Sequence, residues 1–202
     1  HDPHFLLMSP SNPDVMWQQN HCGIFRTTNG GEEWQDISQK DAPAFFGFAV
    51  ALDDKDDKTA WVVPAVSDEY RVAVGGALCV SRTEDGGKTW TNMGLKNTKV
   101  IHRIIIHRDN PDIVYAATMG SPWGPNEDRG VFKTTDGGKT WRKILYVNSE
   151  TGVADMITDP TNPNKLIVAM WEYGRKPWTF NSGGKGSGLY ITHDGGESWE
   201  KR

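Results

Sequence analysis

An eight-residue motif occurs four times in the 202-residue chain and constrains its fold more than any other feature. Each copy begins with Thr, carries Asp or Asn at its third position followed by Gly-Gly, and ends with Trp. The copies occupy residues 27–34, 83–90, 134–141 and 192–199. Asp-Gly and Asn-Gly pairs between apolar runs are typical of tight β-hairpins, because glycine adopts positive φ without steric cost. The motif therefore predicts an array of similar hairpins.

Each motif follows a strand-like run, and a further pair of apolar runs lies upstream of it. In the third repeat, residues 104–107 precede a polar turn at 109–112 and a second run at 113–116. Each repeat thus predicts four short antiparallel strands, and such units stack radially as the blades of a β-propeller. We predict an all-β propeller of four four-stranded antiparallel blades, each with one motif hairpin, at residues 1–40, 41–98, 99–150 and 151–202. A β-sandwich competes, but it does not require the same turn every ~50 residues.

The motif residues are expected to stabilise the blades. An Asp or Asn side chain can accept hydrogen bonds from the N–H groups of its own turn. The closing Trp supplies a large ring for packing between neighbouring sheets. We assign structural roles to Asn29, Trp34, Asp85, Trp90, Asp136, Trp141, Asp194 and Trp199.

The charge distribution excludes several classes of partner. The net charge is −4, and Lys and Arg are scattered among Asp and Glu without a basic run, which argues against nucleic acid. No apolar run approaches the ~20 residues of a membrane helix. The two cysteines show no metal-site spacing, and we expect no metal and no cofactor. The chain begins at His1 without a signal segment, and its compartment stays open.

The four motifs resemble the Asp box, or BNR repeat, of sialidases, xyloglucanases and sortilin-type propellers. Residues 1–93, with the segment 17–25 and Trp61 in an Ala-Trp-Val-Val-Pro run, resemble bacterial sialidase-like and glycosyl-hydrolase-like propellers. Residues 99–202, with segments 123–127 and 175–184, resemble bacterial sortilin-type propellers. The resemblance implies a bacterial parent, for which a secreted or periplasmic location is open, and a chimera that joins two propellers near residues 94–99.

In these families the Asp box is a folding device on the outer rim, so the resemblance does not imply a catalytic role for it. Sialidases carry an Arg triad and a Tyr nucleophile supported by Glu, and this set cannot be assembled here. Xyloglucanases place two carboxylates across a cleft between two propellers, and one short propeller is present here. We therefore predict a non-catalytic module for binding or assembly, directed at a saccharide or a protein. The alternative is a glycoside hydrolase or a fragment of one.

A ligand site is expected where the inner strands begin and where the loops between second and third strands rise. The repeat alignment identifies equivalent residues at the starts of the inner strands, and these starts are expected to converge at one face of the propeller. The loops 67–71, 121–129 and 172–178 supply aromatic and charged side chains at that face. The candidate ligand-binding residues are Trp123, Trp178, Arg103, Asp155, His4, His102, Arg175 and Tyr70. Two structural interpretations stay open: the tryptophans can anchor loops, and Arg103 can pair with Asp155.

A hydrolase would need two carboxyl groups about 5 to 9.5 Å apart. The candidates are Asp155, Glu127 and Glu172, with Asp68 and Glu69 as further loop acids.

A four-blade arc would leave two blade faces exposed, each with an apolar patch that a soluble monomer rarely tolerates. We therefore expect a second copy of the chain as partner, arranged head to tail in an eight-bladed ring. A compact four-bladed monomer is the alternative.

Overall fold

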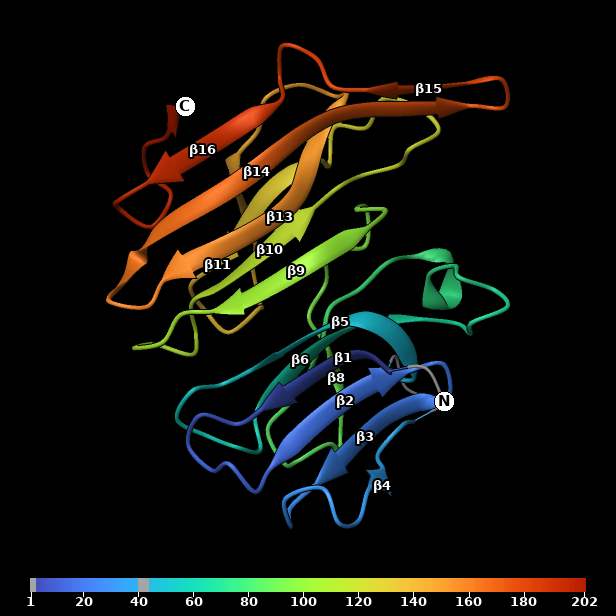
Figure 1. The fold of residues 1–202 in the computed structure, drawn as a ribbon, viewed down its shortest axis with the longest axis vertical. Coiled ribbons are helices and arrows are strands. Elements are labelled where there is room, and N and C mark those ends of the chain that lie inside the picture. The colour runs from blue at the N-terminus through green and yellow to red at the C-terminus, as the bar shows by residue number, and fades with distance from the viewer. Residues whose placement is uncertain (1–2, 40–43) are drawn as a thin grey trace. The chain divides into compact units, whose positions relative to one another are not determined.

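The structure, a computed structural model, describes residues 3–39 and 44–202 (Figure 1). It divides the chain into two compact units, residues 1–97 and 98–202. Each unit contains two antiparallel sheets, each with a path of four strands that pair in chain order, which confirms the predicted all-β chain of four four-stranded blades. The blade limit that the sequence placed at residues 40 and 41 lies outside the described residues.

The first unit holds blades one and two, whose strands pair in chain order. Blade one contains β1 (Pro3–Met8), β2 (Met16–Asn20), β3 (Gly23–Thr27) and β4 (Gln35–Asp36). Blade two contains β5 (Phe46–Leu52), β6 (Ala60–Ala65), β7 (Ser81–Thr83) and β8 (Thr91–Asn92), with a short 3-10 helix, η1 (Val74–Gly76), between β6 and β7. Strand β5 packs against β1 and β2, and the two blades share a core that includes Trp17, Ile24, Val62 and Trp90.

The second unit holds blades three and four. Blade three contains β9 (Ile101–Ile106), β10 (Val114–Thr118), β11 (Gly130–Thr134) and β12 (Arg142–Leu145). Blade four contains β13 (Thr151–Asp159), β14 (Asn162–Lys176), β16 (Gly188–Thr192) and β17 (Glu200–Lys201), and β15 (Thr179–Ser182) pairs with the far end of β14. Strand β13 packs against β9, β10 and β11, and the shared core includes Tyr115, Val131, Met156 and Val168.

Each Asp box is a turn closed by its own side chains, and the box of blade three is representative. The buried Thr134 hydroxyl accepts the Gly138 N–H at 2.9 Å and donates to Asp136 Oδ1 at 2.7 Å. Asp136 in turn accepts the Thr140 N–H at 2.9 Å and its hydroxyl at 2.6 Å. Gly137 and Gly138 have φ of 67° and 92°, a region that side-chain-bearing residues rarely adopt.

The same bonds recur at Asp85 and Asp194, and blade one uses Asn29 in place of the acid. Asn29 Oδ1 accepts the Glu33 N–H at 3.0 Å, as an Asp would. Hydrogen bonds from Thr or Ser neighbours stabilise the charged form of the acidic boxes. They lower the pKa of Asp85 and of Asp136 to about 2, and they lower the pKa of Asp194 as well.

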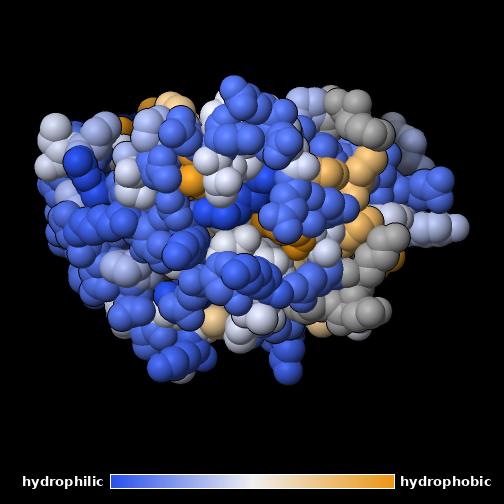
Figure 2. Space-filling model, turned by 90° about the horizontal axis from the view of Figure 1, so that it is seen from below, coloured by the Kyte–Doolittle hydropathy of each residue, from blue (hydrophilic) through white to orange (hydrophobic). Residues whose placement is uncertain are grey.

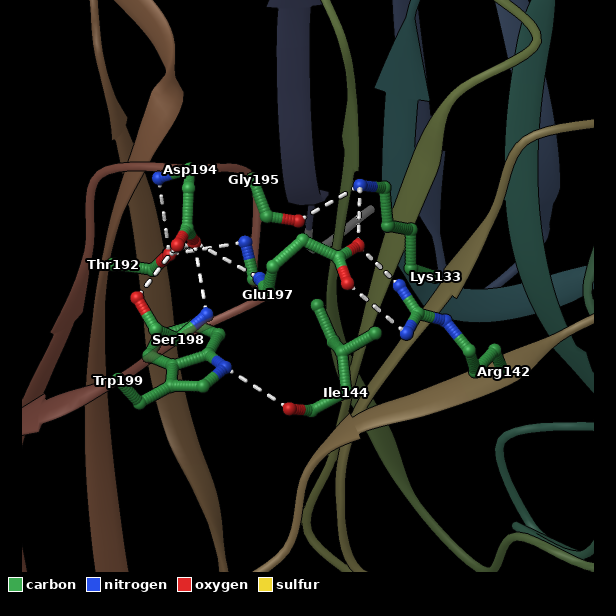
Figure 3. Close-up of polar contacts among 10 residues, drawn as sticks. Lys133, Arg142, Ile144, Thr192, Asp194, Gly195, Glu197, Ser198 and Trp199 are labelled. Atoms are coloured by element: carbon green, nitrogen blue, oxygen red, sulfur yellow. Dashed lines mark hydrogen bonds and ion pairs between the residues drawn. The ribbon is translucent and has the colours of Figure 1, made fainter.

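The fourth box also attaches blade four to blade three (Figure 3). The Trp199 indole N–H donates to the Ile144 carbonyl at 2.9 Å, and the Lys133 ammonium donates to the Gly195 carbonyl at 2.8 Å. Glu197 pairs with the Arg142 guanidinium. The fourth box therefore closes its own blade and binds the blade before it.

Figure 2 shows one face of the molecule covered mainly by hydrophilic residues, with smaller hydrophobic areas toward the right of the view. No helix among the described residues is long and apolar enough to cross a membrane.

Replacing Thr134 with Val tests the box as a stabilising device. The change leaves the buried Gly138 N–H without its acceptor, which costs about 1 to 3 kcal/mol of unfolding free energy. Thr135→Val, on the exposed neighbour, is the matched control and leaves stability within about 0.5 kcal/mol. Chemical denaturation measures both variants, and equal effects of the two would contradict the assignment.

The depressed pKa values of the box acids predict loss of stability in acid. Their folded-state values lie below the ordinary Asp value, so their contribution is complete above about pH 4 and is lost as the pH falls toward about 2. Asp136→Asn, which reproduces the residue of blade one, removes one titrating box and flattens this part of the curve. Melting temperatures between pH 7 and pH 2 provide the measurement, and a variant curve parallel to the wild-type curve would refute it.

Candidate ligand-binding site

The second unit contains a cavity of about 340 Å³ beside the loop that joins β10 to β11. The loop lines one part of it with Trp123 and Arg129, and the β14–β15 hairpin lines another with Tyr173 and Arg175. The backbone N–H of Arg175 donates to the Pro122 carbonyl at 2.6 Å, which fixes the loop to the hairpin. The cavity is thus formed by connections that follow the second strands of two adjacent blades.

The β14–β15 hairpin replaces what the sequence indicated to be a long loop. Residues 173–176 continue β14 beyond its pairing with β13, which ends at Glu172, and β15 returns in register, with Tyr173 opposite Ser182 and Lys176 opposite Thr179. Aromatic side chains on the two strands stabilise this extension. The Trp171 ring stacks on the Tyr173 ring with their centres 4.8 Å apart, and it contacts the Phe180 ring of β15 edge-on at 5.8 Å. Aromatic contact across the two strands therefore stabilises a β-hairpin where the sequence indicated a loop.

Arg129 holds the loop in place from beneath. It is 1% exposed, and its guanidinium donates to the carbonyls of Glu150 at 2.8 Å, Ser121 at 2.6 Å and Gly124 at 3.2 Å. The guanidinium carbon also lies 4.8 Å from the centre of the Tyr173 ring, a cation–π contact. Gly120 permits this path, since a Cβ at that position would lie 2.4 Å from Arg129 Cγ.

The electrostatics of the cavity are positive. Burial lowers the pKa of Arg129, and the nearby acidic groups oppose that shift. Burial also raises the pKa of Tyr173, whose hydroxyl donates to the Gly120 carbonyl at 3.0 Å. Arg175 and Lys176 add two exposed cations to the lining. Of the described residues that line the cavity, Glu150 alone carries a carboxyl group.

Two of the ligand-binding candidates from the sequence line this cavity together. Trp123 is 67% exposed, and Arg175 lies across from it on the hairpin. Trp178, which is 80% exposed, lies in the turn between β14 and β15 and is not part of the lining. The structure therefore separates two tryptophans that the sequence treated alike.

Three further candidates meet elsewhere in the second unit. The Arg103 guanidinium pairs with the Asp155 carboxylate at 2.9 Å, and the His102 Nδ1 lies 3.3 Å from the Ala154 carbonyl oxygen. These contacts join the start of β9 to the middle of β13 and place side by side the residues that the repeat alignment made equivalent. The ion pair fits the interpretation that Arg103 and Asp155 stabilise the fold. Arg103, Asp155 and His102 do not line the cavity.

His4 and Tyr70 belong to the first unit. The His4 ring stacks on Phe48 at 4.4 Å, and its Nδ1 lies 2.8 Å from the Gly47 carbonyl oxygen. Tyr70 is 67% exposed in the connection between β6 and β7. Their assignment as ligand-binding residues stays a prediction.

The candidate catalytic carboxylates all make local contacts. Glu127 accepts the Tyr146 hydroxyl at 2.6 Å, and Glu172 accepts the Gly186 N–H at 2.9 Å. Asp155 pairs with Arg103 and also accepts the Met156 N–H at 2.9 Å. None of the three lines the cavity, so the structure does not assemble them there.

Several residues of the cavity were not among the named ligand-binding candidates, although Arg129, Tyr173 and Lys176 lie in loops that the sequence assigned to the site. They are Arg129, Glu150, Tyr173, Lys176, Thr179 and Asn181. Tyr173 and Lys176 fall in a stretch that the sequence marked as a loop. The large side chains at every second residue from Trp171 onward were the available sign of a strand there. Arg129 gave no sequence signal, because one Arg before a strand is common. The described residues contain no cluster of three metal-ligating side chains.

Comparison with known proteins confirms the resemblance to sortilin-like and glycosyl-hydrolase-like propellers. The Sortilin-Vps10 family model, described as "Sortilin, neurotensin receptor 3", matches residues 79–202. A xyloglucanase from Hypocrea jecorina (strain QM6a) is 25% identical over 172 residues, which cover 79% of this chain and 19% of that protein. The chain thus spans about a fifth of that relative's length. The joining of two propellers near residues 94–99 stays a prediction.

Solved structures share the fold. An ancestral GH74 enzyme superimposes with a TM-score of 0.72 at 18% identity, over 99% of this chain and 24% of that one. The GH74 enzyme of Niastella koreensis gives 0.72 at 16% identity, over 98% of this chain and 30% of that one. At these identities the likeness concerns the propeller fold alone.

Arg129→Lys tests whether the guanidinium supports the cavity. A lysine cannot reach all three carbonyls, and each lost hydrogen bond from a charged donor costs about 1.5 to 3 kcal/mol. We expect a lower unfolding free energy and faster amide exchange in residues 120–129. Arg175→Lys, on an exposed side chain of the same cavity, is the control and leaves both unchanged. Unaltered exchange in Arg129→Lys would show that the loop is held by other contacts.

Proposed function

The chain belongs to the Sortilin-Vps10 family, and on this premise we propose that it is a non-catalytic Asp-box propeller module that binds a saccharide in the cavity of its second unit. The observation that carries the proposal is the pairing of an exposed Trp123 ring with a single carboxyl group in that cavity.

The aromatic and polar groups of the lining suit a sugar. Trp123 lies between Pro122 and Pro125, two residues with restricted backbones, and presents a large flat surface at small entropic cost. Thr179 and Asn181 add a hydroxyl and an amide that can orient sugar hydroxyls. The volume of about 340 Å³ falls at the small end of ligand sites, which span roughly 300 to 1,000 Å³.

The number of carboxyl groups in the lining argues against hydrolysis in this cavity. General acid–base cleavage of a glycosidic bond uses two carboxyl groups about 5 to 9.5 Å apart. Glu150 supplies one, and Glu127, Glu172 and Asp155 are engaged elsewhere.

The relatives indicate which sugars to test first. The curated relative is named a xyloglucanase, so β-glucan oligosaccharides that carry xylose are the primary probe. A glycoside hydrolase remains the second candidate function, since the solved neighbours include GH74 enzymes and the chain covers a quarter to a third of their lengths.

Titration calorimetry with xyloglucan oligosaccharides tests the proposal. Trp123→Ala removes the stacking surface and is expected to weaken binding at least tenfold, or about 1.4 kcal/mol. Trp34→Ala, on the box of blade one, is the matched tryptophan control and leaves the affinity within about twofold. Equal loss in both variants would contradict a site at the cavity. Release of new reducing ends by the wild-type chain would replace the binding module with the hydrolase.

A further inference from the structure

The charges in the cavity of the second unit differ from those of the chain as a whole. The chain has 26 acidic residues and 22 Lys and Arg residues. The lining of the cavity has one acid, Glu150, and three bases, Arg129, Arg175 and Lys176. Arg129 is buried and donates to three carbonyls, so Arg175 and Lys176 are the cations that the cavity presents to solvent. An acidic chain thus concentrates positive charge in this cavity.

Neither exposed cation of the cavity forms a contact with an acid. Exposed arginines elsewhere form ion pairs with carboxylates: Arg71 with Asp68, Arg142 with Glu197, and Arg202 with Glu200. Among the described residues, Arg175 and Lys176 form no ion pair. The Arg175 guanidinium carbon instead lies 5.9 Å from the centre of the Phe180 ring. Two cations are therefore available to an anionic group of a ligand.

The β14–β15 hairpin presents neutral polar groups beside these cations (Figure 1). In its register, Lys176 lies opposite Thr179 and Gly174 lies opposite Asn181. Residues directly opposite each other in an antiparallel pair share a face of the sheet, and so do alternate residues of one strand. Lys176, Thr179 and Asn181 therefore share one face of the hairpin, and all three line the cavity. An ammonium, a hydroxyl and an amide on one face suit a carboxylate and sugar hydroxyls.

Gly174 leaves open space on the same face. Its backbone is outside the left-handed region, and a Cβ at this position would have no atom within 4 Å. Neither the backbone conformation nor a close neighbour therefore requires a glycine here. The absent side chain leaves room beside Lys176 and Asn181 for a ligand.

We propose that the saccharide bound in this cavity is acidic, and that Arg175 and Lys176 bind a carboxylate carried on its ring. This inference rests on the proposed function and narrows its ligand to saccharides that contain a uronic acid. A uronic acid carries its carboxylate directly on the ring, so a ring stacked on Trp123 keeps the charge within a cavity of about 340 Å³. Arg175 offers a planar set of donors and Lys176 a mobile point charge. Thr179 and Asn181 are left for the ring hydroxyls.

Titration calorimetry of the whole chain with three matched trisaccharides tests this inference. The probes are cellotriose, cellotriose oxidised at C6 of its terminal glucose to a carboxylate, and the uncharged methyl ester of that acid. The acid is expected to bind about tenfold more tightly than either neutral probe, because each exposed cation contributes up to about fivefold. An approximately tenfold increase in salt concentration is expected to remove most of this preference by screening the charges.

Single substitutions locate the recognition of the charge. Arg175→Gln and Lys176→Gln each remove one cation, and each is expected to weaken binding of the acid about threefold to fivefold while leaving the ester unchanged. Lys139→Gln, on an exposed lysine in the box of blade three, is the matched control and leaves both affinities unchanged. Gly174→Leu fills the open space on the hairpin and is expected to weaken binding of all three probes at least about tenfold, with an unchanged melting temperature.

The outcomes distinguish this inference from the proposed function. Equal affinity for the acid and its ester, lost together in Gly174→Leu, retains the saccharide site and overturns the acidic ligand. A preference for the acid that survives both Gln variants overturns the roles of Arg175 and Lys176. If none of the three probes binds while xyloglucan oligosaccharides do, this inference alone is wrong; if the xyloglucan oligosaccharides also fail, the proposed function is wrong as well. A triglutamate peptide that binds as tightly as the acid would replace the saccharide with an acidic peptide.

Discussion

The hydrogen bond between a buried Thr hydroxyl and the second Gly N–H of each box is the interaction on which this fold depends. In blade four, Thr192 accepts the Gly196 N–H at 3.0 Å, and this bond sets the direction in which the fourth strand leaves the turn. The turn then places Trp199 against Ile144 and Glu197 against Arg142 (Figure 3). One local bond therefore controls closure within a blade and attachment between blades.

The two ends of a blade serve different purposes. At the box end, the N–H of the first Gly of each motif donates to a backbone carbonyl near the turn between the first and second strands. The Gly137 N–H, for example, donates to the Asp112 carbonyl at 3.0 Å, and the box turn is short in all four blades. At the opposite end, the connection between second and third strands ranges from two residues in blade one, His21 and Cys22, to the β15 hairpin in blade four. Variation is tolerated there because the box already fixes the blade. The ligand site that we propose lies at that end.

The distance between interacting residues decides what the sequence could reveal. The box was predictable because its partners lie within four residues, as Thr134 and Gly138 do. The proximity of Arg103 and Asp155 was predictable because the repeat alignment places them at equivalent positions of the first strands of adjacent blades. The cavity was not, since Arg129 reaches Ser121, Gly124 and Glu150 only after the loop has taken its path. The sequence also did not indicate the partners of the loop acids: Glu127 accepts the Tyr146 hydroxyl and Glu172 accepts the Gly186 N–H, and neither acid lines the cavity.

The burial of Arg129 explains why the cavity has a fixed shape. Taking a guanidinium out of water costs several kcal/mol, so its retention requires compensating contacts. The Ser121 and Gly124 carbonyls of the loop point toward Arg129, and a planar group with five N–H donors binds both while also reaching the Glu150 carbonyl. The Tyr173 ring covers the face of the guanidinium and belongs to the hairpin that forms the opposite wall. Loop and hairpin are thus joined through one side chain, which also binds the backbone on both sides of Trp123.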